Sequence, residues 1–262
     1  MGTMTAVSQA TRVDLELVAR GLAPSRERAQ ALVAAGLVEV DGSRATSADQ
    51  RVGPATTIRL LGRDHPWASR GGLKLAPALD AFGIECAGRV CLDAGASTGG
   101  FTDVLLSRGA SYVYAVDVGR GQLDPRLATD PRVRVMDRTN LRSLSSLPGP
   151  APDLITLDLS FISLRLVMPA VVRLIAPGGA DLVALFKPQF ELGREAIGKG
   201  GIVRDPDAAA QAALAFAGWL ESEFGAAPAS PMPSPVRGAK GNLEWLVGAR
   251  LFRIDAPDTH EP

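Results

Sequence analysis

The stretch RVCLDAGASTGGFTDVLLSRG, residues 89–109, decides the fold of this 262-residue chain. It begins with an apolar strand pattern, passes through a glycine-rich turn and continues into a helix pattern. Backbone N–H groups of such a turn, together with the N-terminus of the following helix, commonly hold a nucleotide-type ligand. The chain is therefore predicted to be an enzyme with a cofactor site at this turn.

Strand and helix patterns alternate around this stretch, from about residue 73 onward. Strands are predicted at 90–94, 112–117, 133–136, 153–158, 181–187 and 244–253, and helices at 73–82, 100–108, 163–175 and 206–223. The alternation predicts an α/β domain over residues 73–255, with a mostly parallel sheet covered on both faces. The Pro-rich segment 226–242 is predicted to be a loop, and residues 256–262 a C-terminal tail.

Residues 11–60 follow a different pattern and predict a small α+β domain. Two short helix patterns end at Gly21 and Gly36, and Ser25 is placed to cap the second. The alternating run LVEVDGSRA then predicts a hairpin around its Asp-Gly turn. Residues 1–10 are predicted to be a disordered N-terminus, and residues 61–72 an interdomain linker.

Composition is that of a soluble globular protein, with 46% apolar and 21% charged residues. The formal net charge is zero, so any affinity for RNA is expected from local patches. The N-terminus lacks the basic and apolar regions of a signal peptide, and no apolar run reaches about 18 residues. A cytoplasmic protein without membrane contact is therefore expected. Two cysteines and two histidines give no pattern for a disulfide framework or a metal site.

The glycine-rich turn differs from the dinucleotide-binding pattern, because Ser97 stands where a second glycine would admit a pyrophosphate. Asp93, just before the turn, suits a cofactor with a cationic sulfonium or amino group. Asp117 ends the next predicted strand, where an acid commonly receives ribose hydroxyls. The candidate cofactor residues of the turn itself are Gly95, Ser97, Thr98, Gly99 and Gly100.

Asp158 and Lys187 follow two further predicted strands of the parallel sheet. The carboxyl ends of such strands meet at one edge, where open α/β folds bind ligands. The apolar run before Lys187 and the proline after it hold this lysine at the edge. A neutral lysine could accept a proton from an alcohol, and a charged one could stabilise the alkoxide. The sequence leaves both roles open.

Residues 12–42 resemble the S4 RNA-binding domain, in which a helix pair presents arginines to RNA. The resemblance implies RNA contacts by Arg12, Arg20, Arg26 and Arg28. The alternative is that these arginines only lie on solvated helix faces. Arginine suits the functional interpretation, since its planar fork can bind a phosphate through two hydrogen bonds.

The glycine-rich turn resembles motif I of S-adenosylmethionine (SAM) methyltransferases, which implies SAM as the cofactor. The same resemblance places Asp117 at the ribose of SAM and Asp137 at its adenine. A set of two lysines and two acids resembles the catalytic tetrad of FtsJ-type ribose 2′-O-methyltransferases: Lys74, Asp158, Lys187 and Glu244. Asp158 is also a candidate cofactor residue. The runs SRGGLKL, DLSFISL, KPQFELG and GNLEWL, in this order after an S4-like segment, resemble the TlyA family.

This resemblance implies SAM-dependent 2′-O-methylation of a cytidine ribose in ribosomal RNA, with the RNA or a ribosomal subunit as partner. The ends of the chain lack a basic lead-in and a C-terminal helix, which predicts large-subunit RNA ahead of small-subunit RNA. The alternatives are an O-methyltransferase for a small hydroxylated molecule, a membrane-active haemolysin, and an RNA-binding protein without activity. The missing membrane-seeking segment argues against the haemolysin, and the tetrad against the inactive protein. The oligomeric state is not predicted.

Overall fold

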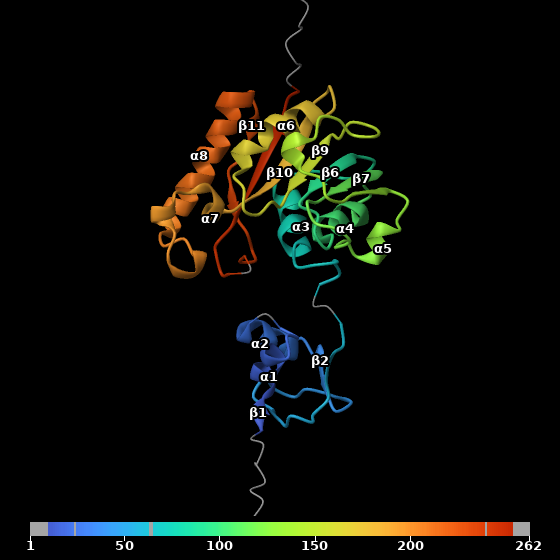
Figure 1. Cartoon of the computed structure of the whole chain (residues 1–262), viewed down its shortest axis with the longest axis vertical. Helices are drawn as coiled ribbons and strands as arrows, with labels where there is room; N and C mark the ends of the chain where they lie inside the picture. Colours follow the sequence, from blue (N-terminus) through green and yellow to red (C-terminus); the bar gives the residue numbers. More distant parts are fainter. Residues whose placement is uncertain (1–9, 24, 63–64, 239, 254–262) are drawn as a thin grey trace, which may run out of the picture. The chain divides into compact units, whose positions relative to one another are not determined.

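The structure is a computed structural model that describes residues 10–23, 25–62, 65–238 and 240–253. The chain forms two compact units, Met1–Pro66 and Trp67–Pro262 (Figure 1). The boundary falls inside the predicted linker, because Trp67 and Ala68 pack with the second unit. The expectations for residues 1–9 and 256–262 lie outside the described residues.

The first unit is a helix pair beside short antiparallel strands. Its helices are α1 (Val13–Ala19) and α2 (Arg26–Ala34). The Ser25 side chain accepts a hydrogen bond from the Arg28 N–H and caps α2, as the sequence predicts. The predicted hairpin is formed by β2 (Val38–Val40) and β3 (Ser43–Arg44), and β5 (Ile58–Leu60) pairs with the other side of β2. A separate pair is formed by β1 (Thr11–Arg12) and β4 (Arg51–Val52).

The second unit is built around an eight-stranded sheet in the order β11-β13-β10-β9-β6-β7-β8, with β12 paired to β13 beside this path. Its strands are β6 (Val90–Ala94), β7 (Tyr112–Val116), β8 (Val133–Met136), β9 (Leu154–Leu157), β10 (Ala180–Phe186), β11 (Ala227–Pro228), β12 (Met232–Pro233) and β13 (Trp245–Leu251). The five strands from β10 to β8 are parallel, and β13 runs antiparallel to β10. The predicted mostly parallel α/β sheet is thus confirmed.

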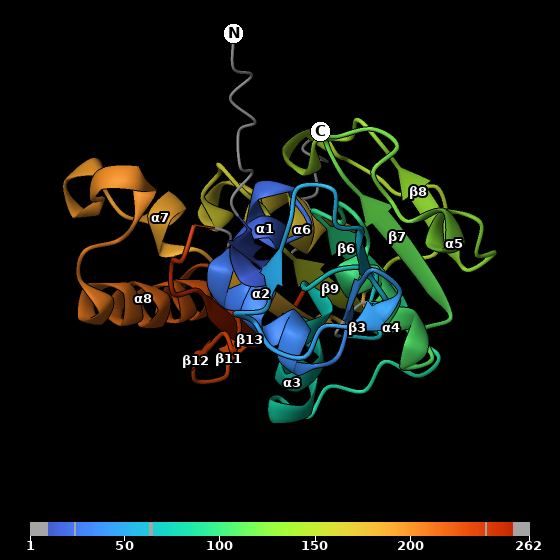
Figure 2. The ribbon, with the colours of Figure 1, turned by 90° about the horizontal axis from the view of Figure 1, so that it is seen from below.

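Helices cover both faces of this sheet, as Figures 1 and 2 show. Helices α3 (Gly72–Ala81) and α4 (Gly100–Ser107) cover one face, and α6 (Met168–Leu174) and α8 (Pro206–Phe224) the other. The central position of β10 in the sheet explains why its sequence is almost continuously apolar. Leu182 and Phe186 belong to the core cluster with Phe216 of α8, whereas Val183 and Leu185 belong to the cluster with α3. Both faces of the strand are therefore buried.

The Pro-rich segment 226–242 is more ordered than predicted, since β11 and β12 lie within it. Both pair with β13, which has room for partners beyond β10. Proline is tolerated there because an edge strand leaves some backbone groups without ladder partners. The predicted helix 163–175 is divided into η2 (Leu164–Leu166) and α6. The other short elements lacked a sequence pattern: α5 (Pro125–Ala128), α7 (Pro188–Glu191), η1 (Leu141–Ser143), η3 (Arg194–Ala196) and η4 (Lys199–Gly201). Among the described residues, none of the helices is both long and apolar enough to span a membrane.

Candidate active site

The glycine-rich turn leads from β6 into α4 at the carboxyl end of the parallel strands. The chain continues from β6 to β7 on one side and later returns as β9 on the other, so the strand order reverses here. Open α/β sheets bind ligands at such a point. Gly95 has a φ of +85°, and a Cβ there would overlap the backbone carbonyl oxygen of Asp158. Only glycine lets the turn pass this close to the end of β9.

The four candidate catalytic residues lie together as two ion pairs. Lys74 Nζ is 2.6 Å from Glu244 Oε2, and Lys187 Nζ is 2.6 Å from Asp158 Oδ1. Lys187 Nζ also donates a hydrogen bond to Ser160 Oγ at 3.0 Å. All four side chains line one cavity of about 380 Å³, the tetrad cavity. Two ammonium groups and two carboxylates from four separate elements thus converge on one space.

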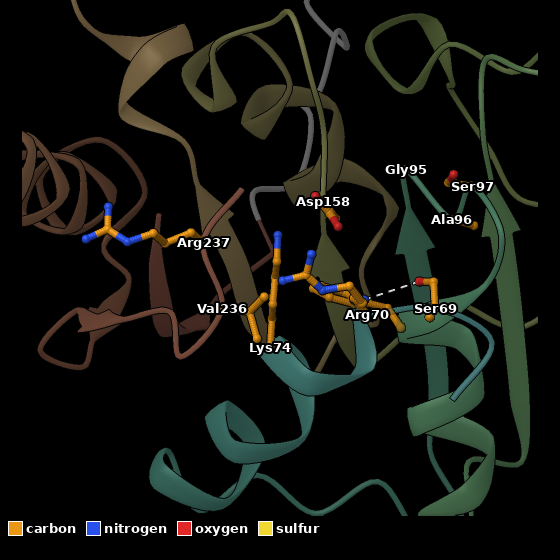
Figure 3. Close-up of a pocket in the computed structure, with 12 residues that line it drawn as sticks. Ser69, Arg70, Lys74, Gly95, Ala96, Ser97, Asp158, Val236 and Arg237 are labelled. Atoms are coloured by element: carbon orange, nitrogen blue, oxygen red, sulfur yellow. Dashed lines mark hydrogen bonds between the residues drawn. The ribbon is translucent and has the colours of Figure 1, made fainter. Parts of the chain in front are cut away.

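Two further cavities adjoin the tetrad cavity. The Asp117 cavity, of about 490 Å³, is lined by Asp117, Gln122 and Asn140 together with apolar side chains. The Arg70 cavity, of about 260 Å³, is drawn in Figure 3. Three residues line all three cavities: Gly95, Ser97 and Asp158. The cavities therefore meet at the glycine-rich turn and the end of β9.

Asp117 presents a fixed carboxylate to the Asp117 cavity. The Ser97 N–H donates to Oδ2 at 2.8 Å, and the Gly119 N–H donates to Oδ1 at 2.7 Å. Each oxygen keeps further acceptor capacity, so the carboxylate could bind the hydroxyls of a ribose. The apolar lining includes Val116, Leu141, Leu159 and Ile162, which suits a planar ring. The cavity therefore fits a nucleoside-type cofactor. In the described part of the chain, no group of three or more His, Cys, Asp or Glu residues is placed to hold a metal.

Asp93, a candidate cofactor residue, lines none of these three cavities. Its side chain is fully buried and accepts hydrogen bonds from the hydroxyls of Thr102, at 2.6 Å, and Thr156, at 3.0 Å. Burial raises the pKa of the Asp93 carboxyl to about 7. The residue connects β6, α4 and β9 beneath the turn, so it supports the cofactor site from inside the protein.

Asp93→Asn is expected to increase stability at pH 8. A carboxyl whose pKa rises from 3.8 to about 7 on folding makes unfolding easier as the pH increases through this range. The cost at pH 8 is up to roughly 4 kcal/mol, and an amide avoids it while still bonding both threonine hydroxyls. Urea unfolding at pH 6 and pH 8 measures the effect. The wild type should lose stability between these pH values and the variant should not; equal pH dependence would contradict the prediction.

Other candidate cofactor residues divide into two groups. Ser97 and Gly100 line cavities, whereas Thr98 and Gly99 do not. Asp137 accepts a hydrogen bond from the Gly121 N–H at 2.7 Å and does not line the Asp117 cavity. Its expected contact to an adenine stays a prediction, and its Oδ1 accepts no hydrogen bond from the described residues. The polar residues of this cavity that the sequence analysis missed are Gln122, Thr139, Asn140 and Ser160.

Phe161 is a second feature that the sequence analysis missed, although its run DLSFISL was noted. The side chain is 86% exposed, and its backbone has a φ of +65°, which is unusual for a bulky residue. Its ring lies 5.0 Å from that of Phe190, measured between centroids. Both rings line the tetrad cavity. An exposed aromatic ring held at the edge of a cavity suits stacking on a planar group.

Glu191, at the end of α7, ties together the loops that carry Asp158 and Lys187. Its Oε2 accepts from the Ser163 hydroxyl at 2.6 Å, and its Oε1 accepts from the Leu164 N–H at 2.7 Å. Burial raises the pKa of this carboxyl, which these hydrogen bonds partly offset. The loops after β9 and β10 are therefore connected twice, by the hydrogen bonds of Glu191 and by the Lys187–Asp158 ion pair.

In the first unit, two of the arginines assigned to RNA, Arg12 and Arg26, contact a buried acid. Asp14 is fully buried and accepts hydrogen bonds from Arg12, Arg26 and Gln30. The bond from Arg12 strongly lowers the pKa of Asp14. Arg26 uses its Nε, and its side chain remains 54% exposed. Arg20 instead bonds Glu16 and the Thr56 carbonyl. Arg12, Arg20 and Arg26 thus each have side-chain partners within the first unit.

Comparisons with known proteins agree with this architecture. The family model described as FtsJ-like methyltransferase matches residues 67–251, and the S4 domain model matches residues 11–58. The chain is 48% identical to the 16S/23S rRNA (cytidine-2′-O)-methyltransferase TlyA of Mycobacterium tuberculosis, over 93% of this chain and 91% of that protein. It is 35% identical to the 23S rRNA (cytidine-2′-O)-methyltransferase TlyA of Campylobacter jejuni, over 69% of each.

A solved structure from Streptococcus thermophilus, described as a hemolysin, superimposes with a TM-score of 0.73 at 37% identity, and covers 97% of this chain and 94% of that one. The fold, the paired tetrad and the nucleoside-type cavity define an FtsJ-like methyltransferase joined to an S4 domain. Within that class, the chain belongs to the TlyA family.

Proposed function

We propose that this protein is a SAM-dependent methyltransferase that modifies the 2′-oxygen of a cytidine ribose in ribosomal RNA. The observation that carries the proposal is the convergence of Lys74, Asp158, Lys187 and Glu244 beside the Asp117 cavity. SAM, when bound, supplies an electrophilic methyl group on a sulfonium. Asp117 would bind the ribose of SAM, and the apolar wall of the same cavity would take its adenine.

Lys187 is the residue that acts on the acceptor hydroxyl. Asp158 and Ser160 fix its Nζ on the wall of the tetrad cavity. From there Nζ donates a hydrogen bond to the 2′-oxygen and stabilises the negative charge that develops as the hydroxyl proton passes to solvent water. The Lys74–Glu244 pair limits the directions from which the hydroxyl can enter. Much of the rate increase then comes from alignment of the oxygen with the methyl group.

Phe161 and Phe190 provide the surface for the base of the target nucleotide. Sequence-specific RNA recognition commonly uses bases that leave their stack and lie on aromatic side chains. The exposed ring of Phe161 at the edge of the tetrad cavity offers such a face. A base stacked there has its ribose next to Lys187.

Large-subunit RNA is the proposed target. The names of the two TlyA relatives have 23S rRNA in common, and only one of them also includes 16S rRNA. The S4 domain supplies RNA affinity that the zero net charge of the whole chain does not.

Transfer of labelled methyl groups from SAM tests the proposal. The acceptors are unmethylated 23S and 16S rRNA, the two ribosomal subunits and small alcohols, and the RNA is digested to nucleosides afterwards. We expect label in 2′-O-methylcytidine from 23S rRNA or its subunit. Label in a base would contradict ribose methylation, and label only in small alcohols would support the small-molecule alternative. Label confined to 16S rRNA would show that the proposed subunit is wrong.

Glu191→Ala is expected to reduce the kcat of methyl transfer about tenfold without weakening SAM binding. The variant loses both hydrogen bonds that join the loops of Asp158 and Lys187, and misplacement of reacting groups is costly. Glu191→Gln should keep most of the activity, because an amide can accept from the Leu164 N–H and donate to Ser163. Glu195→Ala, an exposed neighbour, is the matched control. Equal kcat values for Glu191→Ala and Glu195→Ala would contradict the prediction.

A further inference from the structure

Three cavities meet at Gly95, Ser97 and Asp158, and a sulfonium has three substituents. If the proposed cofactor is SAM, the Asp117 cavity receives its adenosyl group and the tetrad cavity lies on the side of the transferred methyl. The third substituent is an aminocarboxypropyl chain, which ends in an ammonium and a carboxylate. The Arg70 cavity is the remaining space for it.

Arg70 is the distinctive group of this cavity. Its Nε is buried and has no hydrogen-bond partner among the described residues. A buried donor without a partner is unfavourable, so a ligand that accepts from it is expected. Figure 3 shows the Arg70 side chain beside that of Lys74, on the side of the cavity where Asp158 lies.

The other charged groups of the cavity are already engaged. Lys74 pairs with Glu244, and Asp158 pairs with Lys187. Arg237 donates to the Gly241 carbonyl oxygen, and Figure 3 shows it pointing away from Arg70. Within the described ranges, no carboxylate pairs with Arg70. Arg237 also lacks a carboxylate partner among the described residues, but Arg70 is the arginine of this cavity whose buried donor has no acceptor.

We propose that Arg70 binds the α-carboxylate of the cofactor and so recognises the amino acid end of SAM. A guanidinium can form two parallel hydrogen bonds to a carboxylate, a geometry that an ammonium cannot provide. The assignment rests on SAM being the cofactor. It gives a role to the arginine of the run SRGGLKL, of which the tetrad uses only Lys74.

Calorimetric titration without RNA tests this assignment. The two ligands are SAM and decarboxylated SAM, which lacks only the α-carboxylate. The proteins are the wild type, Arg70→Met, Arg70→Lys and the control Arg237→Met, whose altered side chain lines the same cavity. We expect the wild type and Arg237→Met to bind SAM at least tenfold more tightly than the decarboxylated compound. Arg70→Met should bind both compounds with similar, weak affinity, and Arg70→Lys should retain part of the preference.

The other possible results would overturn either the role of Arg70 or the proposed cofactor. If Arg70→Met keeps the preference for SAM, or weakens both ligands by the same factor, Arg70 does not bind the carboxylate. If Arg70→Met leaves both affinities unchanged and a separate titration with RNA shows weaker binding, the anion is a phosphate of the RNA and the assignment is also wrong. A wild type that binds neither ligand would overturn the proposed cofactor itself, whereas one that binds both equally would overturn only the role of Arg70.

Discussion

Replacing Lys187 by methionine is expected to lower the rate of methyl transfer to RNA on the order of 10³-fold. Methionine has a similar length but cannot donate a hydrogen bond to the 2′-oxygen or carry a positive charge. Removal of one donor to a developing oxyanion typically costs a factor of about 10²–10³, and Lys187 supplies both the donor and the charge. Single-turnover transfer from labelled SAM to the RNA substrate measures the rate directly.

Cofactor binding separates this effect from a damaged site. Lys187 lines the tetrad cavity and neither of the other two, so the SAM affinity of Lys187→Met should stay within about threefold of the wild type. Lys199→Met is the matched control, because Lys199 is exposed in η4 outside these cavities. Full activity of Lys187→Met would remove the central element of the proposed mechanism. Loss of SAM binding in the same variant would instead indicate a structural role.

The sequence predicted the tetrad region well because the physics of parallel sheets is regular. Asp158 and Lys187 directly follow β9 and β10, two adjacent parallel strands, so their side chains emerge at the same edge. Their ion pair, with 2.6 Å between Nζ and Oδ1, is a finding of the structure, since the sequence pattern does not specify strand order. The contribution of Lys74 and Glu244 came from the family resemblance, since no local pattern places α3 next to the segment before β13.

The two acids of the cofactor region show where a sequence pattern is insufficient. Asp117 follows the last residue of β7 and reaches the cavity, whereas Asp93 lies inside β6 and points into the protein. Asp93 lies in register with Ala115, two residues before Asp117, so the two acids differ in their position along the strands, and the alternation of side chains between faces does not separate them. A strand pattern does not specify how far along the strands the cavity begins. The loop residue Asn140 had no pattern at all.

In the first unit, the hydrogen-bond partners of Asp14 could not be predicted from the sequence pattern either. Its partners Arg26 and Gln30 lie 12 and 16 residues away, on the other helix of the pair. A helix pattern indicates which residues share a face, but it does not specify which faces of two helices meet. The arginines were predicted, and the buried carboxylate that fixes two of them was not.

Removing residues 1–66 is expected to weaken binding of the ribosomal RNA substrate about a hundredfold and leave SAM affinity within about threefold. The deletion takes away the arginines that we propose contact phosphates, and such contacts supply most of the affinity in nonspecific RNA binding. All residues that line the three cavities belong to the second unit. Starting at Trp67 keeps the ring that packs on Gly72 and the Ala68 N–H that donates to Asp103.

The dependence of RNA affinity on salt shows whether the lost contacts are electrostatic. Each phosphate contact adds about 0.7 to the slope of log affinity against log salt for single-stranded regions. The full-length double variant Arg12→Gln/Arg26→Gln should therefore have a slope that is smaller by roughly 1.4. The slope of the truncated protein should be smaller by this amount or more. Equal RNA affinity with and without residues 1–66, or an unchanged slope in the double variant, would show that the S4 arginines do not bind the RNA backbone. Recognition would then have to come from the second unit, where Phe161 and the basic residues around the tetrad cavity are the available contacts.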